Sequence, residues 1–174
     1  MGEPRALESL IRAIPDFPQP GILFRDITPL LHEPAALSQT NDRLAEIARA
    51  WDTTLVAGIE ARGFLFGVPV AERLQLPFVP VRKPGKLPAD RASAFYELEY
   101  GEDSLELHRD PSVAGHRVAI VDDLLATGGT AAAAVRLVEE LGGTVAGLAF
   151  VIELDELSGR SVLAAHPVEA LLSY

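Results

Sequence analysis

The sequence has no cysteine, fewer positive than negative charges and no long apolar run, and each of these features argues against a class of protein. Without cysteine the chain can form neither a disulfide bond nor a thiolate metal site. Its 15 lysines and arginines face 25 aspartates and glutamates, which gives a formal net charge of −10. A nucleic-acid-binding protein needs a basic surface, so this balance argues against such a partner. The longest apolar run, residues 145–152, is too short to cross a bilayer. We therefore expect a cytoplasmic protein without a membrane partner.

The remaining composition is that of an ordinary globular protein. The chain has 174 residues, of which 48% are hydrophobic and 23% charged, and we predict a single domain over residues 1–174. Segments with helical and strand patterns alternate along the chain. This order predicts an α/β fold with a mostly parallel twisted sheet and helices on both faces. The expected helices cover residues 3–14, 34–51, 64–74 and 130–141, and the expected strands cover 55–59, 78–81, 118–121, 145–152 and 168–172.

Two segments do not fit this alternation. Residues 16–31 contain several prolines, and we expect them to be extended and loop-like. Residues 82–107 are polar and irregular, apart from a predicted hairpin formed by 95–100 and 104–107. Loops of this length in a compact domain usually carry function or are disordered.

The most informative stretch is residues 118–130, VAIVDDLLATGGT. It predicts a buried strand that ends at two aspartates, Asp122 and Asp123, followed by a glycine-containing turn that opens a helix. Unpaired backbone N–H groups and the helix dipole make such a turn suitable for a phosphate. The aspartates suit sugar hydroxyls or a hydrated metal ion. A simple turn with a helix cap is the alternative interpretation of the same residues.

Two further polar segments follow predicted strands. Residues 60–63, Glu-Ala-Arg-Gly, come after the strand at 55–59, and Arg82 and Lys83 come after the strand at 78–81. In open parallel sheets ligands bind outside the carboxyl ends of the strands. We therefore expect these segments and the aspartate pair to form one site, although each could also be a solvated turn.

Residues 118–130 resemble the signature of the type I phosphoribosyltransferases, enzymes that use phosphoribosyl pyrophosphate (PRPP). The resemblance implies that Asp122 and Asp123 hold the ribose hydroxyls. It also implies that the following loop holds the 5′-phosphate. That loop comprises Ala126, Thr127, Gly128, Gly129 and Thr130.

The same resemblance assigns the other two segments to pyrophosphate. A non-proline cis peptide is common in the family's first loop and would fall here between Glu60 and Ala61. Some relatives have Asp-Ser at these two positions, which leaves the side-chain roles of Glu60 and Ala61 open. A multiply charged leaving group needs cations to stabilise it. The implied pyrophosphate-binding residues are Glu60, Ala61, Arg62, Arg82, Lys83, Lys86 and Tyr100.

The resemblance identifies residues 83–107 as a mobile catalytic loop that closes over the reacting groups. Glu99 is the implied acid or base near the incoming base, with Glu97 as the alternative, and Arg62 and Lys86 are the other implied catalytic residues. Loop closure would exclude water, which could otherwise hydrolyse the activated sugar.

An N-terminal segment, residues 15–35, resembles the hood that covers the base in the adenine-specific branch of the family. Phe24 would stack on the purine, while the backbone from Leu23 to Arg25 would read its edge. Phe24 could instead be a core anchor. Ala126 stands where enzymes for 6-oxopurines typically have aspartate, which favours adenine.

The resemblance implies a reaction that converts adenine and PRPP to AMP and pyrophosphate, with Mg²⁺ bound through substrate oxygens and not held directly by the protein. It also implies a homodimer. A xanthine or other purine phosphoribosyltransferase is the alternative enzyme, and a non-catalytic PRPP-sensing regulator is the alternative from another class.

Overall fold

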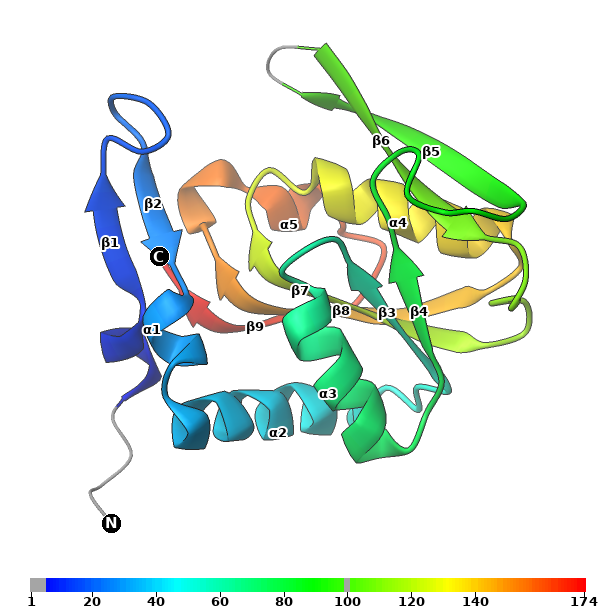
Figure 1. Ribbon diagram of the computed structural model, residues 1–174, viewed down its shortest axis with the longest axis horizontal. Coiled ribbons are helices and arrows are strands. Elements are labelled where there is room, and N and C mark those ends of the chain that lie inside the picture. The colour runs from blue at the N-terminus through cyan, green and yellow to red at the C-terminus, as the bar shows by residue number, and fades with distance from the viewer. Residues whose placement is uncertain (1–5, 99–100) are drawn as a thin grey trace. The chain divides into compact units, whose positions relative to one another are not determined.

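The computed structural model describes residues 6–98 and 101–174 (Figure 1). The chain falls into two compact units that divide between Asp42 and Arg43, within a helix. The prediction of a single domain over residues 1–174 stays a prediction. Among the described residues, no helix has both the length and the apolar character needed to traverse a bilayer.

The first unit corrects two sequence predictions. Of the helix expected over residues 3–14, the described part contains only a short 3₁₀ helix, η1 (Leu7–Leu10), followed by a strand, β1 (Arg12–Pro15). The segment expected to be loop-like contains a second strand, β2 (Leu23–Asp26), and a one-turn helix, α1 (Thr28–Leu31). The two strands pair antiparallel. The helical pattern failed here because this pairing joins residues that are distant in sequence, which a local period cannot reveal.

Asp26 links strand β1 to the start of helix α1. One carboxylate oxygen accepts a hydrogen bond of 3.0 Å from Nε of Arg12 in β1. The other accepts one of 2.9 Å from the backbone N–H of Thr28, at the start of α1. Only 8% of Asp26 is exposed. The hydrogen bonds from Thr28 and Arg12 lower the pKa of this carboxyl group to about 2.

A long helix, α2 (Pro34–Ala50), passes from the first unit into the second and confirms the helix predicted over residues 34–51. The second unit is built on a five-stranded sheet in the order β4-β3-β7-β8-β9, in which every neighbouring pair is parallel. All five strands were predicted. Their bounds are β3 (Leu55–Ile59), β4 (Phe78–Val81), β7 (Arg117–Leu125), β8 (Thr144–Glu153) and β9 (Val168–Ser173).

The strand order places a switch point between β3 and β7. From β3 the chain moves outward to β4 through helix α3 (Phe64–Leu74), and from β7 it moves the opposite way to β8 through helix α4 (Gly129–Glu140). Crossover connections are right-handed, so crossovers in opposite directions put their helices on opposite faces of the sheet. Figure 1 shows α3 and α4 on opposite faces. The two loops that diverge from β3 and β7 therefore leave a crevice between them.

Strands β3 and β8 are continuous apolar runs in the sequence because their side chains are buried on both faces. Every residue of β3 is buried, as are nine of the ten residues of β8. Parallel strands covered by helices on both faces have no solvent-facing side and so show no alternation. The resulting core includes Ile59, Ile120, Leu148 and Phe150.

An antiparallel hairpin separates β4 from β7, and it extends beyond the residues predicted for it. Its strands are β5 (Arg91–Leu98) and β6 (Gly101–His108), with Tyr96 opposite Asp103. The hairpin packs against α4, where the guanidinium of Arg136 donates a hydrogen bond to the Phe95 carbonyl. Two short helices, η2 (Asp155–Leu157) and α5 (Gly159–Val162), were not predicted.

We expect Asp26→Asn to destabilise the protein by about 1–2 kcal/mol near pH 7, because it removes a charged acceptor of buried hydrogen bonds. A carboxyl group whose pKa is lowered by folding adds stability above its unfolded pKa, and that stability is lost as the pH falls toward the folded value of about 2. The difference in unfolding free energy between wild type and variant should therefore become smaller as the pH falls from about 4 to about 2. Urea unfolding across this range measures it.

The control for this measurement is Glu8→Gln, which removes a negative charge from an exposed residue of the same unit. If the loss of unfolding free energy in Asp26→Asn stayed constant down to about pH 2, the carboxylate charge would contribute nothing to the stability of the fold.

Candidate active site

A cleft of about 250 Å³ lies at the carboxyl ends of β3 and β7, at the switch point of the sheet. Its wall comprises the loop after β3, the end of β7, the loop that leads into α4, and Lys83 after β4. The structure thus brings together most of the residues that the sequence assigned to one site. The lining residues that were predicted are Glu60, Ala61, Arg62, Lys83, Asp122, Asp123, Ala126, Thr127, Gly128, Gly129 and Thr130.

The loop after β3 turns sharply into helix α3, and its peptide bond between Glu60 and Ala61 is cis, as the resemblance implied. Gly63 closes the turn. A Cβ atom at this position would lie 2.5 Å from the Ile59 carbonyl oxygen and 2.8 Å from the Val121 carbonyl oxygen. Only glycine lets the loop approach β7 this closely. The loop therefore stays beside the aspartate pair.

The two aspartates lie inside β7, which runs to Leu125, so the prediction that the strand ends at this pair was wrong. Pairing of β7 with β3 stops at Val121, whereas pairing with β8 continues to Leu125. The sequence shows the local apolar run but not the unequal lengths of the neighbouring strands. Because β3 ends first, Asp122 and Asp123 line the cleft from a rigid strand.

Arg62 is the counter-ion of this pair. Its Nε lies 2.9 Å from Oδ2 of Asp123, whose side chain is only 5% exposed. The backbone N–H of Asp123 donates a 2.8 Å hydrogen bond to the Asp122 carboxylate. Burial, together with the neighbouring Asp123 charge, raises the pKa of Asp122 well above its ordinary value. Burial also raises the pKa of Asp123, against the opposing effect of Arg62.

The loop between β7 and α4 has the features of a phosphate site. Gly128 has φ +85°, a left-handed conformation that favours glycine, and α4 begins at the next residue. The backbone N–H groups in the first turn of a helix have no acceptors within the helix, and the helix dipole adds positive potential there. These groups belong to residues that line the cleft, so an anion could bind them.

Sequence reasoning missed the support beneath this loop. A Cβ atom on Gly159 would lie 2.1 Å from the Ala126 carbonyl oxygen, and one on Gly128 would lie 2.6 Å from the Gly159 carbonyl oxygen. Two backbone segments far apart in sequence therefore contact each other directly. A lone glycine after a serine gave no signal for this contact.

The basic segment after β4 is held by Glu60. One carboxylate oxygen of Glu60 accepts hydrogen bonds of 2.9 Å from Arg82 Nε and 2.8 Å from the Lys83 backbone N–H. The hydrogen bond from Arg82 is the main cause that lowers the pKa of Glu60. Glu60 thus contacts the predicted cations, and its acidic side chain holds their segment in place.

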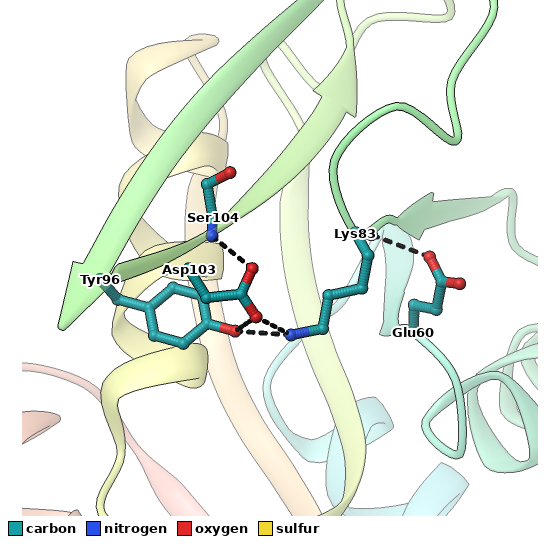
Figure 2. A network of polar contacts seen from close by, with 5 residues as sticks. All are labelled: Glu60, Lys83, Tyr96, Asp103 and Ser104. Atoms are coloured by element: carbon teal, nitrogen blue, oxygen red, sulfur yellow. Dashed lines mark hydrogen bonds and ion pairs between the residues drawn. The ribbon is translucent and has the colours of Figure 1, made fainter. Parts of the chain in front are cut away.

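The side chain of Lys83 reaches the β5–β6 hairpin (Figure 2). Its ammonium donates hydrogen bonds to the Tyr96 hydroxyl, at 2.7 Å, and to the Asp103 carboxylate. Burial of the ammonium opposes these contacts, but the bonds to Asp103 and Tyr96 outweigh it and raise the pKa of Lys83. The bond from Lys83 lowers the pKa of Asp103. Neither Tyr96 nor Asp103 was predicted. They reach Lys83 through the pairing of β5 with β6, which no local sequence pattern reveals.

Of the predicted residues that the structure describes in the second unit, Arg82 and Lys86 are absent from the cleft lining. Lys86 is exposed, on a loop whose Gly85 backbone N–H bonds Glu106 at 3.1 Å. Glu99 and Tyr100 lie outside the described residues, and the side chain of Glu97 is not described either. The predicted adenine-binding residues 23–25 belong to the first unit. Their positions relative to the cleft stay a prediction.

The cleft has the chemistry to bind a metal ion together with a substrate. Within residues 6–98 and 101–174, no three histidine, aspartate or glutamate side chains cluster as metal ligands would. Asp122 and Asp123 are adjacent carboxylates in the cleft. Mg²⁺ usually keeps several waters and is commonly bound by one or two carboxylates together with substrate phosphates.

Comparison with known proteins places this geometry in a family. The profile of the phosphoribosyl transferase domain matches residues 26–171. Adenine phosphoribosyltransferase of Gloeobacter violaceus is 58% identical over 97% of this chain and 99% of its own. The crystal structure of adenine phosphoribosyltransferase from Thermoanaerobacter pseudethanolicus has a TM-score of 0.93 and 52% identity, over 97% of this chain and 98% of that one.

A third similar protein is adenine phosphoribosyltransferase from Saccharomyces cerevisiae. Its crystal structure contains an imino-altritol bisphosphate and adenine. The TM-score is 0.90 and the identity 44%, over 95% of this chain and 96% of that one. The fold, the cleft at the switch point and these matches agree, and the chain belongs to the phosphoribosyltransferase family.

Proposed function

We propose that this chain transfers the 5-phosphoribosyl group of PRPP to adenine, giving AMP and pyrophosphate. The observation that carries the proposal is the cleft in which an aspartate pair, a helix-opening phosphate loop and basic side chains converge. The relatives named as adenine phosphoribosyltransferases, which match this chain over nearly its full length, support adenine as the acceptor.

The ribose and its 5′-phosphate bind along the end of β7 and the start of α4. Asp122 and Asp123 accept hydrogen bonds from the ribose 2′- and 3′-hydroxyls, and the loop from Ala126 to Thr130 holds the 5′-phosphate through backbone N–H and hydroxyl groups. Both sets of groups line the cleft. Backbone donors of a helix N-terminus bind phosphate without a lysine at that place.

Pyrophosphate binds between the loop after β3 and the segment after β4. Arg62 and Lys83 line the cleft, and Arg82 is held beside them by Glu60. Lys86 and Tyr100 are proposed to join this group. Mg²⁺ supplies further charge neutralisation for the departing pyrophosphate when bound, and Asp122 and Asp123 are the residues that would hold it, through substrate oxygens and water.

The reaction breaks the bond between C1′ and the pyrophosphate oxygen and forms a bond from C1′ to N9 of adenine. Positive charge develops on the sugar as the leaving group departs, so the carboxylates of Asp122 and Asp123 stabilise it. Arg62 and Lys83 stabilise the negative charge that gathers on pyrophosphate. The proton lost from adenine goes to Glu99, the proposed base, with Glu97 as the alternative.

Adenine is proposed to bind beside the first unit, with Phe24 stacked on the purine and the backbone of residues 23–25 at its edge. Phe24 is half-buried, and its ring contacts the Phe17 ring edge-on with centroids 5.2 Å apart. Ala126 supports the preference for adenine, because an aspartate at that position serves 6-oxopurines in the family.

We also propose that the protein is a cytoplasmic homodimer. Helix α3 leaves two large apolar side chains exposed, Leu65 at 44% and Val68 at 48%. Exposed apolar side chains on one helix support a contact with a second copy.

We expect AMP to form when the protein is mixed with PRPP, Mg²⁺ and adenine, and no nucleotide to form from hypoxanthine, guanine, xanthine or orotate. Chromatography of nucleotide products measures this for each base separately. Nucleotide formed from xanthine or another purine would contradict adenine as the acceptor, but it would leave the proposed PRPP site unchanged. PRPP binding without any product would favour the PRPP-sensing regulator.

We expect Asp122→Asn to stabilise the fold while weakening PRPP binding about tenfold or more, because a hydroxyl loses its ionised acceptor. Burial raises the pKa of Asp122 in the folded protein. An acid whose pKa is raised by folding contributes stability below its unfolded pKa, and it opposes folding as the pH rises beyond that value. Removing its charge should therefore raise the midpoint of thermal unfolding near pH 7.

Thermal unfolding without ligand and calorimetric titration with PRPP give the two readouts. Asp90→Asn is the matched control, because the side chain of Asp90 is 84% exposed and Asp90 is not among the residues that line the cleft. PRPP affinity equal to wild type in Asp122→Asn would remove Asp122 from the ribose site.

We expect Phe24→Ala to raise the KM for adenine about tenfold with little change in the KM for PRPP, because stacking on a base contributes about 1–3 kcal/mol. Steady-state kinetics with each substrate varied in turn separates the two constants. Ile22→Ala, an exposed neighbour, is the control. An unchanged adenine KM in Phe24→Ala would leave Phe24 as a structural residue.

A further inference from the structure

Lys83 faces two environments. Lys83 is one of the residues that line the cleft, together with Arg62 and Asp123, while its ammonium is bound by two hairpin residues, Tyr96 and Asp103 (Figure 2). Its backbone N–H is held separately by Glu60 at 2.8 Å. The segment therefore stays in place whichever partner the ammonium takes.

Asp103 is anchored independently of Lys83. One of its carboxylate oxygens accepts a 2.8 Å hydrogen bond from the Ser104 backbone N–H, and the other accepts one of 2.9 Å from the Tyr96 hydroxyl. Both donors are in the same hairpin, where Tyr96 and Asp103 lie opposite each other. The carboxylate thus keeps its position and two of its hydrogen bonds when the ammonium leaves.

The ion pair between Lys83 and Asp103 is of a kind that exchanges easily. The side chains are 37% and 27% exposed, so water screens their attraction. A pyrophosphate anion carries more negative charge than one carboxylate and offers more acceptor oxygens. An ammonium has three donors on a flexible stem, which lets it move from one anion to the other.

We propose that Asp103 is a built-in competitor for pyrophosphate, because it binds the same ammonium of Lys83 when pyrophosphate is absent. This inference rests on the proposed function, in which Lys83 contacts the pyrophosphate of PRPP and of the product. Asp103 weakens pyrophosphate binding and gives Lys83 a partner as the product leaves. It is a positioning residue that sets product affinity through Lys83 and does not touch the substrate.

The test is a double-mutant cycle on the inhibition of AMP synthesis by pyrophosphate. Asp103→Asn keeps the size of the side chain and one acceptor oxygen, but it replaces the other oxygen with an NH₂ donor and removes the charge. We expect the inhibition constant for pyrophosphate to fall about two- to fivefold, the range measured for partly exposed ion pairs. We expect Lys83→Met to raise it, and Asp103→Asn to have no further effect in the Lys83→Met background.

The control is Asp90→Asn, which makes the same change in net charge at an exposed residue 3.8 Å from Arg109. Three results would overturn the proposal. Asp103→Asn could leave pyrophosphate inhibition equal to that of wild type or of Asp90→Asn. It could weaken inhibition, which would show that Asp103 holds Lys83 ready for pyrophosphate. Its effect could also persist in the Lys83→Met background, which would show action through overall charge.

The cycle also separates this proposal from the proposed function. If Lys83→Met leaves pyrophosphate inhibition unchanged, Lys83 is not a pyrophosphate ligand and the competition is disproved, although AMP synthesis by the wild type still stands. If the wild type makes no AMP from adenine, the proposed function itself fails. In that case calorimetric titration of the same variants with pyrophosphate still tests the competition.

Discussion

The close approach of the loop after β3 to strand β7 is the constraint on which the cleft depends. Gly63 allows it, because any Cβ there would meet carbonyl oxygens of both Ile59 and Val121. This contact fixes Arg62 within 2.9 Å of Asp123. It also sets where helix α3 begins, at Phe64. A loop displaced by even one side chain would separate the cation from the carboxylates, and the two halves of the cleft would no longer face each other.

Charge pairing follows from that geometry. The protein carries a net charge of −10, yet it gathers three cations around the carboxyl ends of its strands. Each has a carboxylate partner from another segment: Arg62 with Asp123, Arg82 with Glu60, and Lys83 with Asp103. The acids hold the cations in position, and the proposed competition with pyrophosphate concerns only the pair of Lys83 and Asp103. The local gathering of cations, and not the net charge, is what lets an acidic protein offer a site to an anion.

Local patterns predicted the second unit better than the first. The strands over residues 55–59 and 78–81 and the helix over 64–74 have the predicted bounds, because continuous burial and helical periodicity are visible within a few residues. The first unit depends on the pairing of Arg12 with Asp26 across a loop. No local period encodes that pairing, so a helix was predicted where β1 forms.

The same division applies to the candidate site. Asp122, Asp123 and the glycine-containing turn were evident because they are contiguous in sequence. Tyr96, Asp103 and Gly159 were not, since each reaches the cleft residues through strand pairing or through close contact of two backbones. Contiguous motifs identify groups that bind a substrate. The long-range contacts decide what those groups bind before the substrate arrives, and therefore how much of their attraction is available to it.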